Sequence, residues 1–116
     1  MAAPTPGVTI RVVSNRLPAL PAELRGLVVD QVAASTYEVE AKAKAVVPVR
    51  TGTLRRSIHS IFENGGLTGI CGPSVDYGQY VEFGTRHIPP RPYMRPAAAT
   101  VLPKFAEALA RLLRGL

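Results

Sequence analysis

Two histidines and one cysteine, His59, His87 and Cys71, are the side chains of this sequence that could bind a soft metal or form a nucleophilic pair. A zinc site generally takes four ligands, three of them from protein even at a catalytic centre, and these residues have no such spacing. A Cys–His pair is defined in space rather than along the chain, so spacing alone leaves it open. Cys71 lies in an expected strand, where a small buried thiol is the ordinary arrangement.

The carboxylates do not form a general acid–base pair. Asp76 and Glu82 flank one short expected helix, and a separation of six residues directs their side chains to different sides of it. Asp76 is better placed to cap that helix. Gly65, Gly66 and Gly69 lie in an expected hairpin with no helix behind them, so they do not form a phosphate-binding loop. The sequence therefore predicts no enzyme, no cofactor and no metal.

An aromatic and proline-rich stretch between positions 77 and 96 indicates a contact surface instead. It holds three of the four tyrosines and four of the eleven prolines of a chain without tryptophan. Its first part predicts a short helix over 76–83, because Tyr77, Tyr80 and Val81 recur at helical spacing. Gly84 suits the left-handed residue that closes such a helix. The prolines that follow remove amide donors and favour an extended arm over 85–96.

The charge of the chain is basic and unevenly spread. The formal net charge is +6 and the pI is near 10.1, which favours an acidic partner such as nucleic acid, an acidic protein or an anionic membrane. Residues 48–58 carry +3, residues 59–82 carry −3, residues 83–95 carry +3 and residues 96–116 carry +2. Alternating patches fit self-association at least as well as a single nucleic-acid face.

Length and composition indicate one folded domain. The 116 residues are 47% hydrophobic and 19% charged, which is typical of a folded protein. A single cysteine excludes an internal disulfide and fits a reducing compartment. No apolar run approaches the roughly 20 residues of a membrane helix. The first seven residues lack the layout of a secretory signal. We expect a protein that is made and used, or assembled, inside a cell.

The hydrophobic periods predict the elements that position the contact stretch. Residues 1–7 are expected to form a flexible tail, and residues 8–13 are expected to form a strand. Residues 22–47 form a long amphipathic helix that ends before Pro48 and lies on a sheet. The expected buried side chains of the strand are Val8, Ile10 and Val12. Those of the helix are Leu24, Leu27, Val28, Gln31, Val32, Ser35, Val39, Ala43 and Val46.

The second half of the chain completes an α+β fold. Residues 48–56 read as a connector with a glycine-centred turn, and 57–72 as a β-hairpin around Asn64-Gly65-Gly66. Residues 97–115 form a C-terminal helix, which either begins near Thr100 or is kinked at Pro103. Its expected apolar stripe is Leu102, Phe105, Leu109 and Leu112 or Leu113. The predicted fold is a small antiparallel sheet against one long helix, with the short helix, the arm and the C-terminal helix, in a single domain 1–116.

Three segments in order carry a family resemblance. They are T-G-x-L-x-x-S-I at 51–58, Y-x-x-Y-V-E-F-G-T at 77–85 and P-R-P-Y-x-R-P-A at 90–97. Over residues 22–116 the chain resembles the tail-completion, or head–tail joining (neck), family of long-tailed bacteriophages and gene transfer particles. It departs from the family pattern at Arg50, where an acidic residue is common, and at Tyr93, where phenylalanine is common.

The resemblance implies a non-enzymatic virion protein that is assembled in the host cytoplasm. Members of the family form a ring, expected to be six-fold, at the head-proximal end of the tail, which joins the tail to the head connector and lets DNA pass. The implied partners are further copies of the chain, the head connector, the tail tube or terminator, and DNA bound without sequence specificity, with no membrane. Alternatives are another neck position (connector adaptor or tail terminator), a free basic nucleic-acid-binding protein, and a small enzyme using Cys71 or His59.

Candidate contact residues follow from this function, because each subunit of a closed ring needs two different complementary patches. The expected subunit or partner contacts are Tyr77, Tyr80, Val81, Glu82, Phe83, Arg86, Pro89, Pro90, Arg91, Pro92 and Tyr93. The expected contacts to a DNA channel or an acidic partner are Arg50, Arg55 and Arg56. The alternative for each arginine is that it is simply a solvated surface charge. The alternative for about half of the aromatic residues is that they anchor the short helix to the core.

Overall fold

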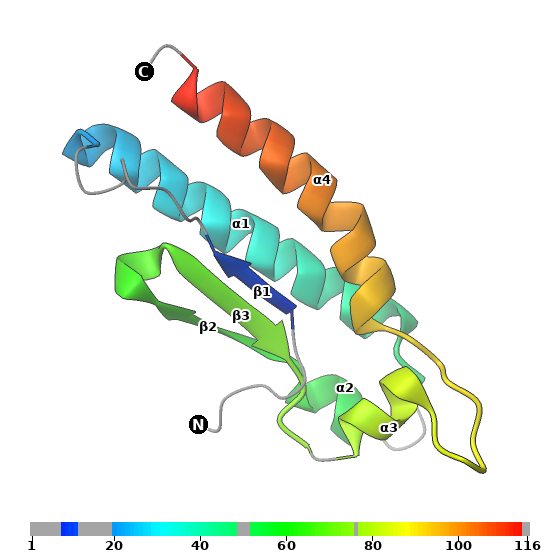
Figure 1. Cartoon of the computed structure of the whole chain (residues 1–116). Helices are drawn as coiled ribbons and strands as arrows, with labels where there is room; N and C mark the ends of the chain where they lie inside the picture. Colours follow the sequence, from blue (N-terminus) through cyan, green and yellow to red (C-terminus); the bar gives the residue numbers. More distant parts are fainter. Residues whose placement is uncertain (1–7, 12–19, 49–51, 76, 115–116) are drawn as a thin grey trace.

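The long helix and a three-stranded sheet form the body of the protein, with two short helices at one end (Figure 1). The computed structural model describes residues 8–11, 20–48, 52–75 and 77–114, and the side chains of 8–11 and of Gln79 lie outside this description. The molecule is elongated, with principal extents of 51 × 27 × 21 Å. The predicted α+β fold is confirmed.

Helix α1, Ala22–Val46, is the predicted long helix. The amide of Val47 still bonds to Ala43, and Pro48 then ends the helix as expected. Val28, Val32, Val39 and Ala43 are buried at helical spacing, together with Ser35 and Thr36. The prediction was wrong for Leu27 and Val46, which are 51% and 56% exposed. Leu27 lies about a quarter turn from Val28 and off the buried stripe, while Val46 is the last residue of the helix.

The sheet has the order β1-β3-β2, and both pairings are antiparallel. Its strands are β1 Val8–Arg11, β2 His59–Glu63 and β3 Thr68–Gly72. The predicted hairpin turn is present, since Asn64, Gly65 and Gly66 all have positive φ. The expectation for the inner side of 8–13 falls on side chains and residues outside the described part. Strand β3 is the central strand of the sheet, and it pairs with β1 on one side and with β2 on the other.

A short helix, α2 Thr53–Ser57, replaces part of the predicted connector and the first residue of the predicted hairpin. Gly52 precedes it with φ +82, which is the expected glycine turn. Leu54 and Ile58 are both buried, and their spacing of four places them on one side of a helical turn. The second short helix, α3 Gly78–Phe83, lies within the predicted 76–83.

Helix α4, Met94–Leu113, begins three residues before the predicted start at position 97 and runs through Pro103 without interruption. A start near Thr100 was therefore wrong. The side chain expected at Leu102 is 39% exposed, and Val101 takes its place in the core. The buried residues of α4 are Met94, Ala97, Val101 and Phe105, with Leu109 and Leu113 partly buried.

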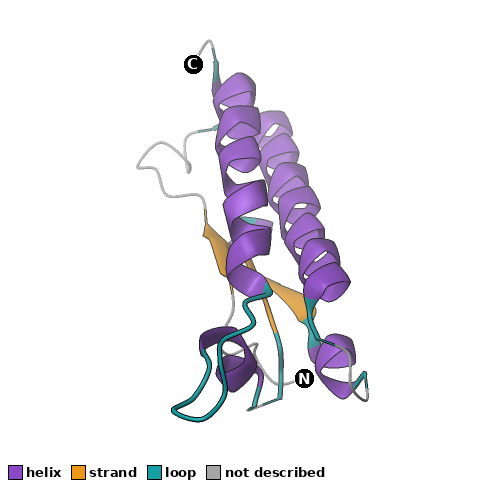
Figure 2. Cartoon of the chain, turned by 90° about the vertical axis from the view of Figure 1, so that its right-hand side faces the viewer, coloured by secondary structure: helices purple, strands orange, loops and turns teal. Residues whose placement is uncertain are grey.

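The two long helices lie side by side and antiparallel, and α1 separates most of α4 from the sheet (Figures 1 and 2). Lys104 of α4 reaches Glu38 of α1 with an N–O distance of 2.6 Å. The core lies between α1, α4 and the inner face of the sheet. This body supports α2, α3 and the segment that joins α3 to α4 at the end where α1 stops and α4 starts.

Candidate contact surface

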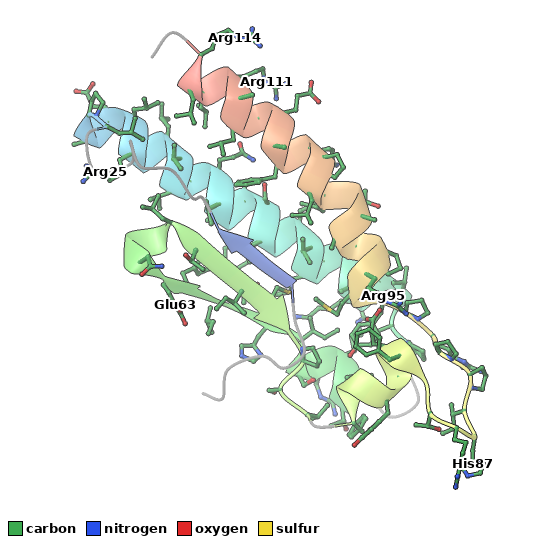
Figure 3. All side chains as sticks on the ribbon, viewed as in Figure 1. Arg25, Glu63, His87, Arg95, Arg111 and Arg114 are labelled. Atoms are coloured by element: carbon green, nitrogen blue, oxygen red, sulfur yellow. The ribbon has the colours of Figure 1, made fainter. Side chains whose placement is uncertain are left out.

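The segment Thr85–Pro92, which we call the arm, leaves α3 and folds back to the start of α4. The amide of Thr85 donates to the carbonyl of Ile88 at 2.8 Å, and the amide of Ile88 donates to Thr85 Oγ1 at 3.0 Å. The amide of Arg91 then bonds to the carbonyl of Val81 at 2.8 Å. Figure 3 shows His87 at the outer tip of the molecule. The arm is therefore a closed loop with backbone bonds at its tip and base, and it ends at Pro92 rather than at position 96.

Gly84 makes the reversal between α3 and the arm possible. Its φ is +75 and its ψ is 176, a combination that is essentially restricted to glycine. A Cβ at this position would lie 2.7 Å from the nitrogen of Pro90 and 2.8 Å from the carbonyl oxygen of Ile88. The expected positive φ is present, and the close approach of the returning chain adds a second reason for glycine.

Glu82 holds the start of α4 from inside the protein. Its carboxylate accepts hydrogen bonds from the amides of Tyr93 and Met94, at 3.1 and 2.7 Å, and a longer one from Arg95. These are amides that a helix leaves without partners at its N-terminus, and a negative charge is favourable there. Glu82 is 1% exposed, so the structure places this expected contact residue inside the protein. It fixes the contact surface instead.

Arg95 closes the same junction from the solvent side. Its Nε donates to the carboxylate of Glu82 at 2.9 Å, and Nη2 donates to the carbonyl of Glu82 at 3.0 Å. The guanidinium also lies 4.9 Å from the ring centroid of Phe83, within the range of a cation–π contact. Sequence reasoning missed this arrangement. Glu82 and Arg95 are thirteen positions apart, and the residues between them carry no periodic signal that would pair the two.

Tyr93 is the second predicted contact residue that the structure places inside. It is fully buried, and its hydroxyl donates to the carbonyl of Gly78 at 2.9 Å. Burial, and secondarily the nearby charge of Glu82, raises the pKa of Tyr93 well above its usual value. Tyr93 therefore ties α3 to the start of α4. Of the four aromatic residues Tyr77, Tyr80, Phe83 and Tyr93, it is the one that anchors this region to the core.

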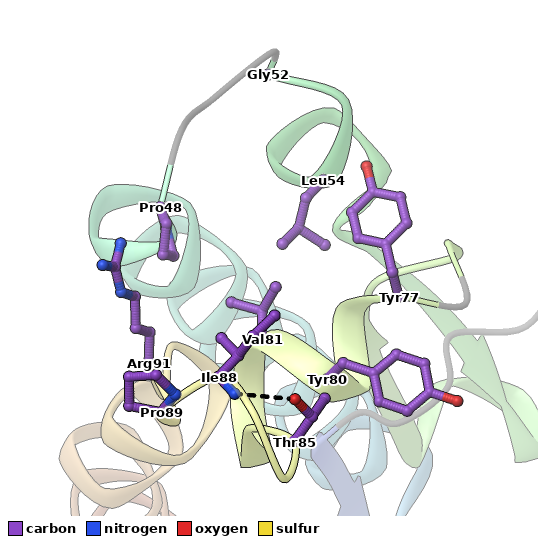
Figure 4. A pocket seen from close by; sticks show the side chains of 10 residues that line it. All are labelled: Pro48, Gly52, Leu54, Tyr77, Tyr80, Val81, Thr85, Ile88, Pro89 and Arg91. Carbon is purple, nitrogen blue, oxygen red and sulfur yellow. Dashed lines mark hydrogen bonds between the residues drawn. The ribbon is translucent and has the colours of Figure 1, made fainter.

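The other aromatic side chains of this region face outward. Tyr77, Tyr80 and Phe83 are 44%, 52% and 55% exposed, and Ile88 on the arm is 58% exposed. A hollow of about 800 Å³ opens beside them between α2, α3 and the arm (Figure 4). It is lined by Pro48, Gly52, Leu54, Tyr77, Tyr80, Val81, Thr85, Ile88, Pro89 and Arg91. Exposed apolar side chains around a hollow mark a surface suited to contact.

The surface around the hollow is basic. Arg55, Arg56, Arg86 and Arg91 are exposed and form no ion pair with a described carboxylate. Within 52–62 and 77–95 the one carboxylate is that of Glu82, which is buried and bound to Arg95. We call this part of the molecule, made of α2, α3 and the arm, the arm end. Arg50 and Asp76, expected as a charge contact and a helix cap, lie outside the described residues.

The candidate catalytic residues are not brought together. Ser60 lies opposite Cys71 in the sheet register, so His59 one residue earlier faces the other side. Cys71 is fully buried, and burial raises its pKa to about 11. His87 lies at the tip of the arm (Figure 3). Among the residues that the structure describes, no three or more His, Cys, Asp and Glu side chains gather where they could hold a metal ion.

Burial of Cys71 gives a first testable prediction. The folded chain at pH 8 should react with a thiol reagent about 100-fold more slowly than the urea-unfolded chain, because burial raises the pKa of Cys71 to about 11 and so lowers the fraction of thiolate at this pH. Absorbance of the released thiol product follows the rate. A Cys71→Ala, Leu27→Cys variant, with its thiol on the surface, should react rapidly when folded. Equal rates for folded and unfolded wild type would contradict the buried, protonated thiol.

Comparison with known proteins shows the family to which the chain belongs. None of the described helices is long and apolar enough to cross a membrane. No curated protein and no solved structure matches the chain. A family described as "Bacteriophage HK97-gp10, putative tail-component" matches residues 12–84, from before α1 to the end of α3. The match covers more than half of the sequence and includes the first motif and all but the last residue of the second. The chain therefore belongs to the HK97-gp10-like family of bacteriophage tail components.

Proposed function

We propose that the chain forms a closed ring at the head-proximal end of a phage tail, where it joins the tail to the head connector and lets DNA pass. A structural role in the tail follows from the family. The resemblance of the arm motif to neck proteins supports the head-proximal position. The observation that carries the proposal is the arm end, an outward-facing apolar surface fixed by buried bonds.

The bonding of the arm end supports a role in assembly. Glu82 and Tyr93 together take part in six hydrogen bonds that join α3 to the residues preceding and starting α4, two of them from the side chain of Arg95. An ordered arm loses less conformational entropy on docking than a flexible one. The exposed rings of Tyr77 and Tyr80 are the side-chain types that contribute most to protein interfaces. Such a surface suits repeated contacts between rigid subunits.

Two kinds of partner, DNA and an acidic protein surface, fit the arginines of the arm end. Arg55 and Arg56, the expected contacts to a DNA channel or an acidic partner, are exposed on α2, the helix whose Leu54 lines the hollow. Arg56 folds back over Gly52, since its Nη1 lies 2.7 Å from where a Cβ would stand. Because Gly52 lines the hollow, the guanidinium group of Arg56 lies at the edge of this apolar region. An acidic protein surface is the partner that these two arginines fit best.

The position in the particle is the test of this function. Particles that carry the chain with a C-terminal epitope tag should bind gold-labelled antibody at the head–tail junction. Label along the tail or at its distal tip would contradict the proposal. As a check on the alternative, the purified chain should show no DNA binding that persists at moderate salt. A monomer that binds DNA and is absent from particles would favour a free nucleic-acid-binding protein.

A further inference from the structure

We propose that the hollow of one copy binds the first half of α1 of a second copy, in a head-to-tail contact. The contact face of α1 consists of Glu23, Leu27 and Asp30, which we call the acidic strip. The proposal rests on the proposed function in one respect, since a ring requires repeated contacts between copies. It adds the identity of the two surfaces that meet.

The acidic strip is an exposed helix face with an apolar centre. Its three residues are four and three positions apart, so they lie on one side of α1. Leu27 is 51% exposed, although sequence periodicity places it toward the core. Glu23 and Asp30 are exposed on either side of it and form no ion pair within the described part of the chain. The nearby Ala34 is exposed and small, so no large side chain blocks a docked surface there.

The hollow is complementary to this strip. Its walls are mostly apolar, with Leu54, Tyr80 and Ile88 among them. Arg91 lines it directly, and Arg56 lies at its Gly52 rim. An apolar side chain between two carboxylates would thus meet an apolar hollow between two guanidinium groups. Docking of one helix face into an apolar groove is a common mode of recognition, and arginine is well suited to bind carboxylates there.

The two surfaces cannot meet within one chain. Leu27 lies near the beginning of α1, while the hollow is formed beyond its end (Figures 1 and 4). Leu27 and Val46 are nineteen positions apart, which corresponds to roughly 28 Å of helix. The contact must therefore join different copies. Two different patches that pair in this way make a heterologous contact, which generates a ring when the rotation closes.

Disulfide cross-linking tests the contact directly. Purified Leu27→Cys and Tyr80→Cys chains, each in a Cys71→Ala background and one carrying a size tag, are mixed under mild oxidation. We expect mixed dimers at least tenfold above the yield of a control mixture of Ala110→Cys with Tyr80→Cys. Ala110 is exposed in the last part of α4, and this end of α4 lies at the same end of the molecule as the beginning of α1 (Figure 1). Thermal unfolding of each variant confirms that the fold is intact.

Charge-reversal variants provide the second part of the experiment. In the cross-linking background, Arg91→Glu and Asp30→Arg should each lower the yield of mixed dimers several-fold, and their combination across the contact should restore it. A yield equal to the control mixture would overturn the proposal. So would cross-linking of Tyr80→Cys to another tail protein, in assembled tails, without any link to Leu27→Cys.

These outcomes separate the contact from the proposed function. Mixed dimers from a chain that is absent from the head–tail junction would support the contact and contradict the neck position. A ring at the junction without a link between Leu27→Cys and Tyr80→Cys would support the function and overturn the contact. The two claims can thus fail independently.

Discussion

Replacing Glu82 with alanine should lower the free energy of unfolding by about 3 kcal/mol, more than removal of any other carboxylate that the structure describes. The carboxylate is 1% exposed and accepts bonds from three backbone amides and the side chain of Arg95. Without it, the buried amides of Tyr93 and Met94 have no acceptor. The first turn of α4 also loses the negative charge at its N-terminus.

The measurement is thermal unfolding followed by circular dichroism. A loss of this size should lower the Tm by roughly 10 °C in a domain of this length. Glu82→Gln, which keeps one carbonyl acceptor and the side-chain volume, should fall between wild type and Glu82→Ala. Glu107→Ala is the matched control, because that carboxylate is 72% exposed and pairs only with Arg111. Its effect should stay within about 0.5 kcal/mol. Equal effects of Glu82→Ala and Glu107→Ala would contradict the buried cap.

Gly84→Ala should destabilise the protein by about 2–3 kcal/mol and release the arm from α3. The residue has φ +75 with extended ψ, and an added Cβ would overlap the backbone of Ile88 and Pro90. The part of the arm that returns toward α4 would have to move outward. Its bond from the amide of Arg91 to the carbonyl of Val81 should then be lost. Amide hydrogen exchange at Arg91 should accelerate in the variant.

A second glycine provides the control for this prediction. Gly26 lies inside α1 with no heavy atom within 4 Å of an added Cβ. Gly26→Ala should therefore stabilise the helix by about 0.5–1 kcal/mol. Opposite signs for the two substitutions, measured by urea unfolding, would support the strained turn at Gly84. Destabilisation of similar size at both positions would indicate a general intolerance to alanine and would remove the argument for the turn.

The regular elements were predictable because their signals are local. The long helix is visible in the spacing of Val28, Val32 and Val39, and the hairpin in Asn64-Gly65-Gly66. The short helix α2 was missed because five residues carry too little period to separate a helical turn from a connector. Pro96 suggested a later start for α4. A proline at the third helical position needs no amide partner, so the helix can start at Met94.

The place of the exposed aromatic side chains was predictable, but the burial of individual residues was not. The aromatic and proline-rich composition indicated 77–96, and Tyr80 and Phe83 in that stretch are exposed, while a contact made by this surface stays a prediction. Whether each of these neighbouring residues is buried or exposed depends on tertiary packing, which the sequence pattern does not show. Glu82 and Tyr93 stand in the same motifs as the exposed residues, yet both are buried because α4 begins directly against α3. The hollow, formed by segments up to 43 residues apart between Pro48 and Arg91, carries no sequence signal.

The central claim is that the arm end is buried against a neighbour in the assembled tail. A cryo-electron microscopy structure of tails that carry this chain tests it most directly. The account predicts a closed ring next to the head connector, in which Tyr80, Ile88 and Arg91 of each copy contact another chain. The account would be contradicted by a structure in which these three side chains face solvent in every copy.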